Sequence, residues 1–247
     1  MGEVMEAAGM ETILEVNALT KSFGGFTALS GVSLSVSAGE RLGLIGPNGS
    51  GKTTLINCIS GALFNDAGSI RFAGKDVTRR KAHERTCLGI ARSFQIPRPF
   101  ASMTVLENLM VPLAYVCGLN GARAQAQARE ILAQMGLATK AETRASQLSQ
   151  VELRKMELAR AMAARPKLLI SDEAMAGLAG AEVDEVLKIL FELNHQGITI
   201  IMIEHIMQAV MKFSQRVICL DAGKIICEGT PETIVRNTDV QRAYLGA

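Results

Sequence analysis

The chain contains few of the residues that mark disulfide-bonded, cysteine-zinc or membrane-spanning proteins. Its 247 residues include no tryptophan, two tyrosines, and five cysteines that form no C-x-x-C pair. Without such pairs neither a disulfide framework nor a cysteine zinc site is expected, and free thiols indicate a reducing compartment. The apolar run at residues 198–203 is far shorter than the roughly 20 residues of a membrane-spanning helix. No basic cluster typical of a secretion signal opens the sequence. The composition therefore predicts a soluble intracellular protein that reaches a membrane only through a partner.

Net charge is also low. Lysine and arginine total 26, against 24 aspartates and glutamates. This balance provides no basic surplus for nucleic acid and no acidic tail. The sequence therefore predicts no nucleic-acid partner.

The strongest motif is a glycine-rich segment that satisfies the phosphate-loop pattern G-x-x-x-x-G-K-[ST]. An apolar run at 42–45 precedes it, and apolar residues at helical spacing follow it. A strand that turns through glycines into a helix directs backbone N–H groups and the positive helix end at one point. In this pattern Lys52 reaches the β- and γ-phosphates, and the Thr53 hydroxyl is a ligand for Mg²⁺. The alternative is an ordinary glycine turn between a strand and a helix. The motif comprises Gly46, Pro47, Asn48, Gly49, Ser50, Gly51, Lys52, Thr53 and Thr54.

Strands and helices alternate on both sides of a helical interlude. Short strands near the start and a hairpin at 70–77 predict a small antiparallel sheet. Thr104 and Glu107 form a capping box that opens the interlude. Later strands at 168–171 and 198–203, with a helix between them, favour a mainly parallel sheet covered by helices. We expect a leader at 1–12 and a single domain at 13–247. In that domain 13–97 and about 149–230 form the core with its β subdomain, about 98–148 a helical subdomain, and 231–247 a C-terminal helix.

A second group of chemical residues follows the later strands. Asp172 and Glu173 end one strand and His205 follows the next, so all three are expected at the ligand-binding edge of a parallel sheet. Asp172 suits a Mg²⁺ site, and Glu173 is placed to take a proton from an attacking water. The alternatives are a solvated acidic pair and a structural histidine. Gln95 lies where the core passes into the helical segment, where an amide could report γ-phosphate occupancy to that segment, although pattern alone gives this role little support. His83 and His195 are expected on the surface.

The order of these motifs resembles that of ATP-binding cassette (ABC) ATPases over essentially the whole chain. It is most similar to the ATPase subunits of branched-chain amino-acid importers. This resemblance implies a P-loop NTPase with a RecA-like parallel core sheet, an antiparallel β subdomain and an inserted α-helical subdomain. The supporting segments are 21–25, 89–95, 103–108, 148–149, 203–205 and 243–246.

The resemblance also implies roles for individual residues. Phe23 would stack on adenine, and residues 48–54 would hold the phosphates of ATP. Thr53, Gln95 and Asp172 would bind Mg²⁺. Glu173 would be the general base and His205 the switch that orients the γ-phosphate and the water. Ser149 would contact the ATP held by an opposing subunit.

The implied assembly is a dimer of ATPase subunits on the inner face of the cell membrane. Two subunits, identical or different, would close head to tail around two ATP molecules and drive two transmembrane permeases. The surface around 95–108 would receive those permeases. A periplasmic solute-binding protein would act indirectly, and the solute would be a branched-chain or related amino-acid-like compound.

The signature before the second core segment departs from the family pattern L-S-G-G-Q. This chain has Leu148-Ser149-Gln150-Val151-Glu152. Ser149 and Glu152 make a sound capping box, but Val151 adds bulk and Glu152 adds a carboxylate near a triphosphate. Two interpretations remain. The altered signature is tolerated variation in a working ATPase, or the chain belongs to an asymmetric heterodimer. In the heterodimer, this chain's signature would slow ATP hydrolysis at the partner's phosphate loop.

Two rival functions come from other classes. The altered signature also favours a nucleotide-gated scaffold module with little hydrolysis. A DNA-repair or translation ATPase of related fold is disfavoured, because the chain has no heptad insert, no second cassette and no basic surplus.

Overall fold

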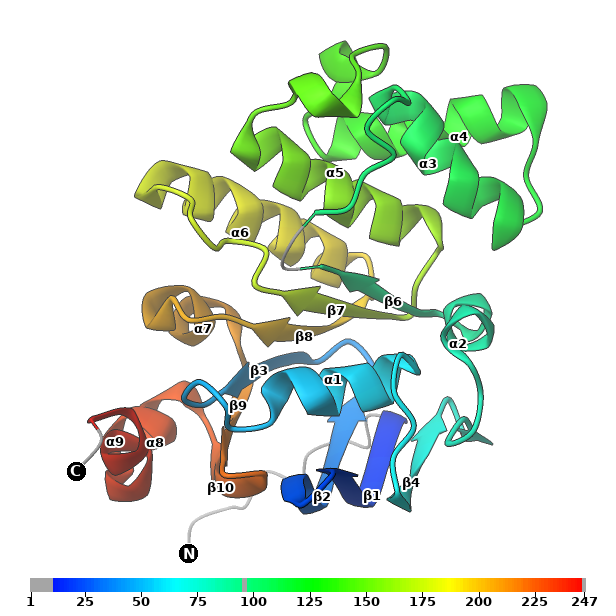
Figure 1. Ribbon diagram of the computed structural model, residues 1–247. Helices are drawn as coiled ribbons and strands as arrows, with labels where there is room; N and C mark the ends of the chain where they lie inside the picture. The colour runs from blue at the N-terminus through cyan, green and yellow to red at the C-terminus, as the bar shows by residue number, and fades with distance from the viewer. Residues whose placement is uncertain (1–10, 95–96, 246–247) are drawn as a thin grey trace, which may run out of the picture.

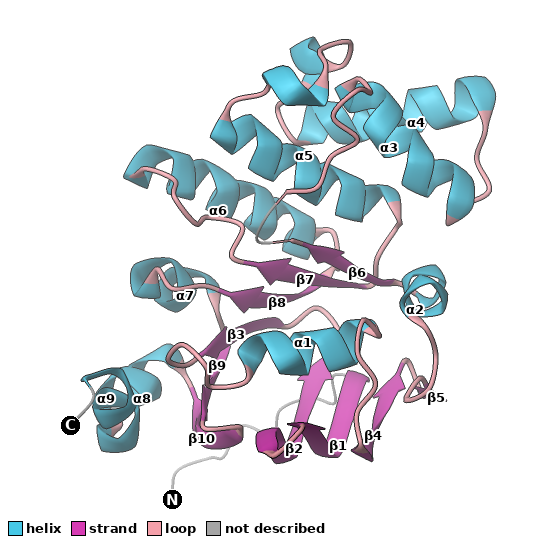
Figure 2. Cartoon of the chain, viewed as in Figure 1, coloured by secondary structure: helices cyan, strands magenta, loops and turns pink. Residues whose placement is uncertain are grey.

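The computed structural model describes residues 11–94 and 97–245 (Figure 1). Two sheets and an upper group of helices make up the molecule, and the secondary-structure colouring of Figure 2 separates these layers. Within the described ranges, no helix is both long enough and apolar enough to cross a bilayer.

A six-stranded sheet forms the centre. Its strand order is β10-β9-β3-β8-β7-β6, and all neighbours are parallel except the β9–β10 hairpin. The parallel strands are almost fully buried, as expected when helices cover both faces of a sheet. Its strands are β3 (Arg41–Ile45), β6 (Ile90–Ser93), β7 (Leu168–Asp172), β8 (Thr199–Ile203), β9 (Arg216–Asp221) and β10 (Lys224–Gly229).

A four-stranded antiparallel sheet lies beside it, as the sequence predicts. Its order is β2-β1-β4-β5, and the first hairpin is longer than the sequence indicates because both strands continue to the turn at Gly24 and Gly25. Apolar residues from both sheets and from helix α1 form one shared core cluster. The strands are β1 (Thr12–Phe23), β2 (Phe26–Ser37), β4 (Ala67–Phe72) and β5 (Lys75–Asp76).

The helices cover the parallel sheet and build the upper lobe of Figure 1. In that lobe α3, α4 and α5 pack together around fully buried side chains such as Leu109, Leu113 and Leu132. The helices are α1 (Lys52–Ser60), α2 (Ala82–Leu88), α3 (Val105–Tyr115), α4 (Gly121–Gln134), α5 (Gln150–Ala163), α6 (Gly180–His195), α7 (Met207–Phe213), α8 (Pro231–Arg236) and α9 (Thr238–Leu245), with 3₁₀ turns at Ala138–Lys140 and Ala145–Gln147.

Several helix boundaries follow from capping residues. Thr104 accepts a hydrogen bond from the Glu107 N–H while the Glu107 carboxylate accepts one from the Thr104 N–H, so the predicted capping box is present. The C-terminal segment differs from the expected single helix. Asn237 adopts an extended conformation, and its side-chain oxygen accepts hydrogen bonds from the backbone N–H groups of Asp239 and Val240. This arrangement divides the segment into α8 and α9.

Candidate functional site

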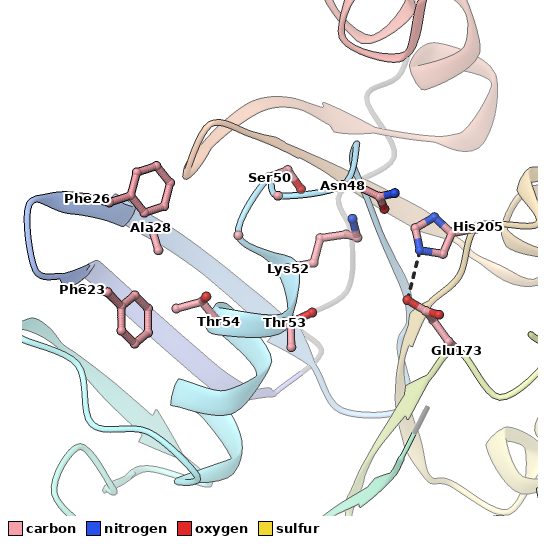
Figure 3. A pocket seen from close by; sticks show the side chains of 12 residues that line it. Phe23, Phe26, Ala28, Asn48, Ser50, Lys52, Thr53, Thr54, Glu173 and His205 are labelled. Atoms are coloured by element: carbon pink, nitrogen blue, oxygen red, sulfur yellow. Dashed lines mark hydrogen bonds and ion pairs between the residues drawn. The ribbon is translucent and has the colours of Figure 1, made fainter. Parts of the chain in front are cut away.

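A pocket lies where the phosphate-loop segment, the start of α1 and the loops after β7 and β8 meet. This position is the carboxyl edge of the parallel sheet, where open α/β sheets bind ligands. Figure 3 shows two aromatic rings at one end, the glycine-rich loop in the middle, and Glu173 with His205 at the other end. The lining residues are Phe23, Phe26, Ala28, Asn48, Gly49, Ser50, Gly51, Lys52, Thr53, Thr54, Glu173 and His205.

The loop that follows β3 has the conformation of an anion-binding turn. Gly49 and Gly51 have φ angles of 80° and 106°, which L-amino acids with side chains rarely adopt. A Cβ atom at Gly51 would also lie 2.7 Å from the Ala28 carbonyl oxygen. Helix α1 begins at Lys52 without a side-chain cap, so its first N–H groups are directed at the pocket. This geometry suits a phosphate group.

Lys52 lies within the loop itself. Its ammonium donates hydrogen bonds to the carbonyl oxygens of Gly46, at 2.7 Å, and Pro47, at 2.9 Å. Because an ammonium has three donors, these two bonds fix the charge beside the loop and leave a third N–H that could bind a ligand. Burial lowers the pKa of Lys52, and the carboxylate of Glu173 opposes that shift.

Glu173 and His205 meet across the pocket from the loop (Figure 3). His205 Nε2 lies 3.0 Å from Glu173 Oε1, and since an ionised carboxylate only accepts, the ring nitrogen donates. Glu173 has a φ of 48°, a left-handed conformation that is strained for a side-chain-bearing residue. Its backbone N–H donates to Ile203 O at 2.9 Å, which holds this conformation against β8. The loops after two neighbouring strands thus fix the carboxylate and the imidazole together.

Asp172 lies one residue before Glu173 but does not line the pocket. Its carboxylate accepts a hydrogen bond from Arg92 at 2.5 Å, and Arg92 also donates to Asn57 Oδ1. Arg92 stacks on the ring of Phe94, with 5.1 Å between the guanidinium carbon and the ring centroid. The expected metal ligand, Asp172, is therefore held by an arginine of β6.

The donor set fits a magnesium-bound nucleoside triphosphate. The hydroxyl of Ser50 is buried and, among the described residues, has no hydrogen-bond partner, so it is a polar group that a ligand oxygen would satisfy. The Thr53 hydroxyl and the Asp172 carboxylate are oxygen ligands of the kind that Mg²⁺ prefers. Gln95, the other predicted metal ligand, lies outside the described residues.

Ser149 begins helix α5 outside the pocket. Its hydroxyl accepts from the Glu152 N–H at 3.3 Å, and the Glu152 carboxylate accepts from the Ser149 N–H at 2.9 Å. Glu152 also pairs with Lys140 at 3.0 Å. The hydrogen bonds from the Ser149 N–H and from Lys140 lower the pKa of Glu152. The carboxylate is thus directed at its own helix end and at a lysine, which reduces the repulsion that the sequence predicts.

The structure adds residues that the sequence analysis missed. Phe26 lines the pocket beside Phe23, because the β1–β2 turn places the two rings opposite each other. Glu204 is buried, and its carboxylate accepts a hydrogen bond from the Met175 N–H at 2.8 Å in the loop after Glu173. The alternation of side chains along the β1–β2 hairpin could have indicated Phe26 as a partner of Phe23. For Glu204, the sequence offered no signal beyond its position next to His205. His83 and His195 are exposed, as expected.

Comparisons with known proteins agree with this geometry. A model described as ABC transporter matches residues 29–176, and one described as branched-chain amino acid ATP-binding cassette transporter matches residues 224–247. The chain is 38% identical over 246 residues to a probable branched-chain amino acid transport ATP-binding protein LivG of Archaeoglobus fulgidus, covering 95% of this chain and 96% of that one.

Two solved structures resemble the whole fold. A nucleotide-free ATP-binding cassette from an ABC transporter superposes with a TM-score of 0.88 at 34% identity, covering 96% of this chain and 100% of that one. A dimeric ATP-binding cassette in a post-hydrolysis state, bound to ADP and Pi, superposes with a TM-score of 0.81 at 26% identity, covering 89% and 99%. The fold thus resembles that of ATP-binding cassettes, one of which was solved with bound ADP and Pi.

Proposed function

Because this chain belongs to the ABC transporter family and is an ATPase subunit of that family, we propose that it energises the import of branched-chain or related amino-acid-like solutes. The match of residues 224–247 to the branched-chain amino acid model supports this solute class. The observation that carries the mechanism is the placement of Glu173 and His205 directly across the pocket from Lys52.

In the proposed mechanism the phosphate loop binds the triphosphate. The N–H groups of residues 49–54 and the Lys52 ammonium hold the β- and γ-phosphates, and Phe23 stacks on the adenine. Thr53, Asp172 and Gln95 would hold Mg²⁺, which neutralises phosphate charge when bound. Arg92 must share the Asp172 carboxylate with that ion.

The proton-transfer residues act at the other end of the pocket. Glu173 accepts the proton of the attacking water, and the strained backbone at this residue keeps its carboxylate directed at the pocket. His205 orients this carboxylate through its Nε2 donor, and it would also orient the γ-phosphate. Such chemistry needs mainly positioning and charge stabilisation, which these residues provide.

The proposed assembly is a head-to-tail dimer of cassettes. Ser149 lies outside its own chain's pocket, so its predicted phosphate contact requires a second subunit, identical or different, and a related cassette has been solved as a dimer bound to ADP and Pi. Two permeases would dock near residues 97–108 on the inner face of the membrane, with a periplasmic solute-binding protein acting indirectly. The pairing of Glu152 with Lys140 favours a working signature over a scaffold module that barely hydrolyses ATP.

The test of the base is Glu173→Gln, which keeps the size of the side chain and removes its basicity. We expect MgATP affinity to be retained while turnover falls by roughly 10²- to 10⁴-fold, the range for a lost general base. Glu192→Gln, on the exposed face of α6, is the matched control. Undiminished turnover in Glu173→Gln would reject the assignment.

A second experiment addresses the dimer. ATPase activity is measured for the purified chain alone and after mixing with a second cassette subunit that carries an intact L-S-G-G-Q signature. Full activity of the chain alone supports a homodimer with two working sites. Activity that appears only in the mixture supports the asymmetric heterodimer, and negligible turnover even with the permeases present would favour the scaffold function.

A further inference from the structure

The C-terminal helix α9 contacts the first residue of the phosphate loop. The backbone N–H of Gly46 donates a hydrogen bond to the hydroxyl oxygen of Tyr244 at 2.8 Å. The β3 ladder ends at Leu44 on the β8 side and at Ile45 on the β9 side. The Gly46 N–H therefore finds its partner not in a neighbouring strand but in a side chain 198 residues later.

The backbone of Gly46 is tightly enclosed by neighbouring atoms. Its φ is 150°, and an added Cβ would lie 2.1 Å from the Leu220 carbonyl oxygen and 2.7 Å from Ser50 Oγ. Its own carbonyl accepts the hydrogen bond from Lys52. The Gly46 backbone is thus bonded to the C-terminal helix through its N–H and to the phosphate-binding lysine through its carbonyl.

Helix α9 has independent anchors that keep Tyr244 in place. Val240 is buried in the main apolar cluster, together with Ile234 of α8. The Asn237 side chain caps the start of α9, and Gln241 donates a hydrogen bond to Val235 O. The Tyr244 ring is 41% exposed, but its oxygen lies against the loop, and burial raises the pKa of the phenol to about 12. The hydroxyl therefore stays neutral at physiological pH and serves as a fixed acceptor.

We propose that Tyr244 is a positioning residue for nucleotide binding, whose hydroxyl fixes the Gly46 peptide so that Lys52 and the following N–H groups face the phosphates. This inference rests on the proposed function, in which the loop binds the phosphates of ATP. By thermodynamic linkage the effect is reciprocal, so a bound nucleotide stabilises α9 to the same extent as α9 favours the nucleotide.

The test is Tyr244→Phe, which keeps the ring and removes the hydroxyl. A hydrogen bond contributes roughly 0.5–1.5 kcal/mol net, so we expect MgATP to bind about 2- to 12-fold more weakly. The KM for ATP should rise by the same factor while kcat at saturation is unchanged, because Tyr244 contacts neither the nucleotide nor the water. Tyr115→Phe is the matched control, since Tyr115 is the other tyrosine of the chain and is 86% exposed. Equal affinities for the two variants, or a loss in kcat alone, would overturn the proposal.

Amide hydrogen exchange provides a readout that a purely structural role would not change. In the wild-type subunit, MgATP should slow exchange in α9 as well as in the loop, and Tyr244→Phe should abolish the protection of α9 alone. Lys52→Ala distinguishes a failure of the proposed function from a failure of the role of Tyr244. If Lys52→Ala binds MgATP as well as the wild type, the proposed function fails; if it loses binding while Tyr244→Phe matches Tyr115→Phe, only the role of Tyr244 fails.

Discussion

Glu204 is a buried carboxyl group whose ionisation should destabilise the protein at neutral and alkaline pH. Its side chain is 2% exposed, and burial together with the nearby charge of Glu173 raises its pKa from an ordinary 4.5 to about 7. Hydrogen bonds from the N–H groups of Met175 and His205, and the charge of Arg154, act in the opposite direction. The folded state therefore binds a proton between these two pKa values that the unfolded state has lost, so stability falls as pH rises through this window.

Glu204→Gln keeps an oxygen acceptor for the Met175 N–H and cannot ionise. The shift of about 2.5 pKa units corresponds to roughly 3 kcal/mol, so ionisation at pH 8 removes about that much stability from the wild type and none from the variant. The variant therefore has this advantage at pH 8, less the cost of turning its NH2 group toward the His205 N–H. At pH 5.5, only one unit above the ordinary value, the advantage should be about 2 kcal/mol smaller.

Urea unfolding of both proteins at pH 5.5 and pH 8, without nucleotide, measures this difference directly. Glu192→Gln is the control, because its exposed carboxylate should give the same small effect at both pH values. A stability difference between Glu204→Gln and wild type that fails to widen with pH would refute the reasoning.

Three further substitutions test the site and the lobe. Gly46→Ala should destabilise the protein by about 1–3 kcal/mol or more in urea unfolding, because its Cβ meets a backbone carbonyl of β9, whereas Gly180→Ala in open space should be nearly neutral. Leu109→Ala should lower the free energy of unfolding by about 2–5 kcal/mol and leave MgATP affinity unchanged, since it empties part of the lobe core far from the pocket. Phe23→Ala should weaken MgATP binding by roughly 1–3 kcal/mol if this ring stacks on adenine, and a loss confined to Phe26→Ala would transfer that role to the opposite ring.

Local sequence patterns predicted the elements that carry the loop and the acidic residues. The phosphate loop and the residues after β7 and β8 are adjacent to strands with clear apolar runs, so their arrival at one sheet edge follows from parallel topology. The structure indeed brings Lys52, Glu173 and His205 to one pocket. Their chemical roles remain predictions.

The contacts that could not be predicted from the sequence join segments that lie far apart in the chain. Arg92 pairs with Asp172 across β6 and β7, and Tyr244 meets Gly46, and neither pair leaves a periodic signal. Arg85 is fully buried on the short helix α2, where its guanidinium donates to carbonyl oxygens in the last turn of α1 and in the segment before α2. A sequence assigns such an arginine to the surface because arginine is rarely buried without partners, and its partners here are backbone atoms.

The place of β3 in the sheet determines when, during synthesis, the phosphate loop can fold. This strand, which leads into the phosphate loop, pairs only with β8 and β9, whose residues lie between 199 and 221. During synthesis β3 and its glycines emerge from the ribosome long before either neighbour exists, and domains fold as units once their long-range pairings are available. We therefore expect a nascent chain to bind nucleotide only after residues 199–221 have been translated.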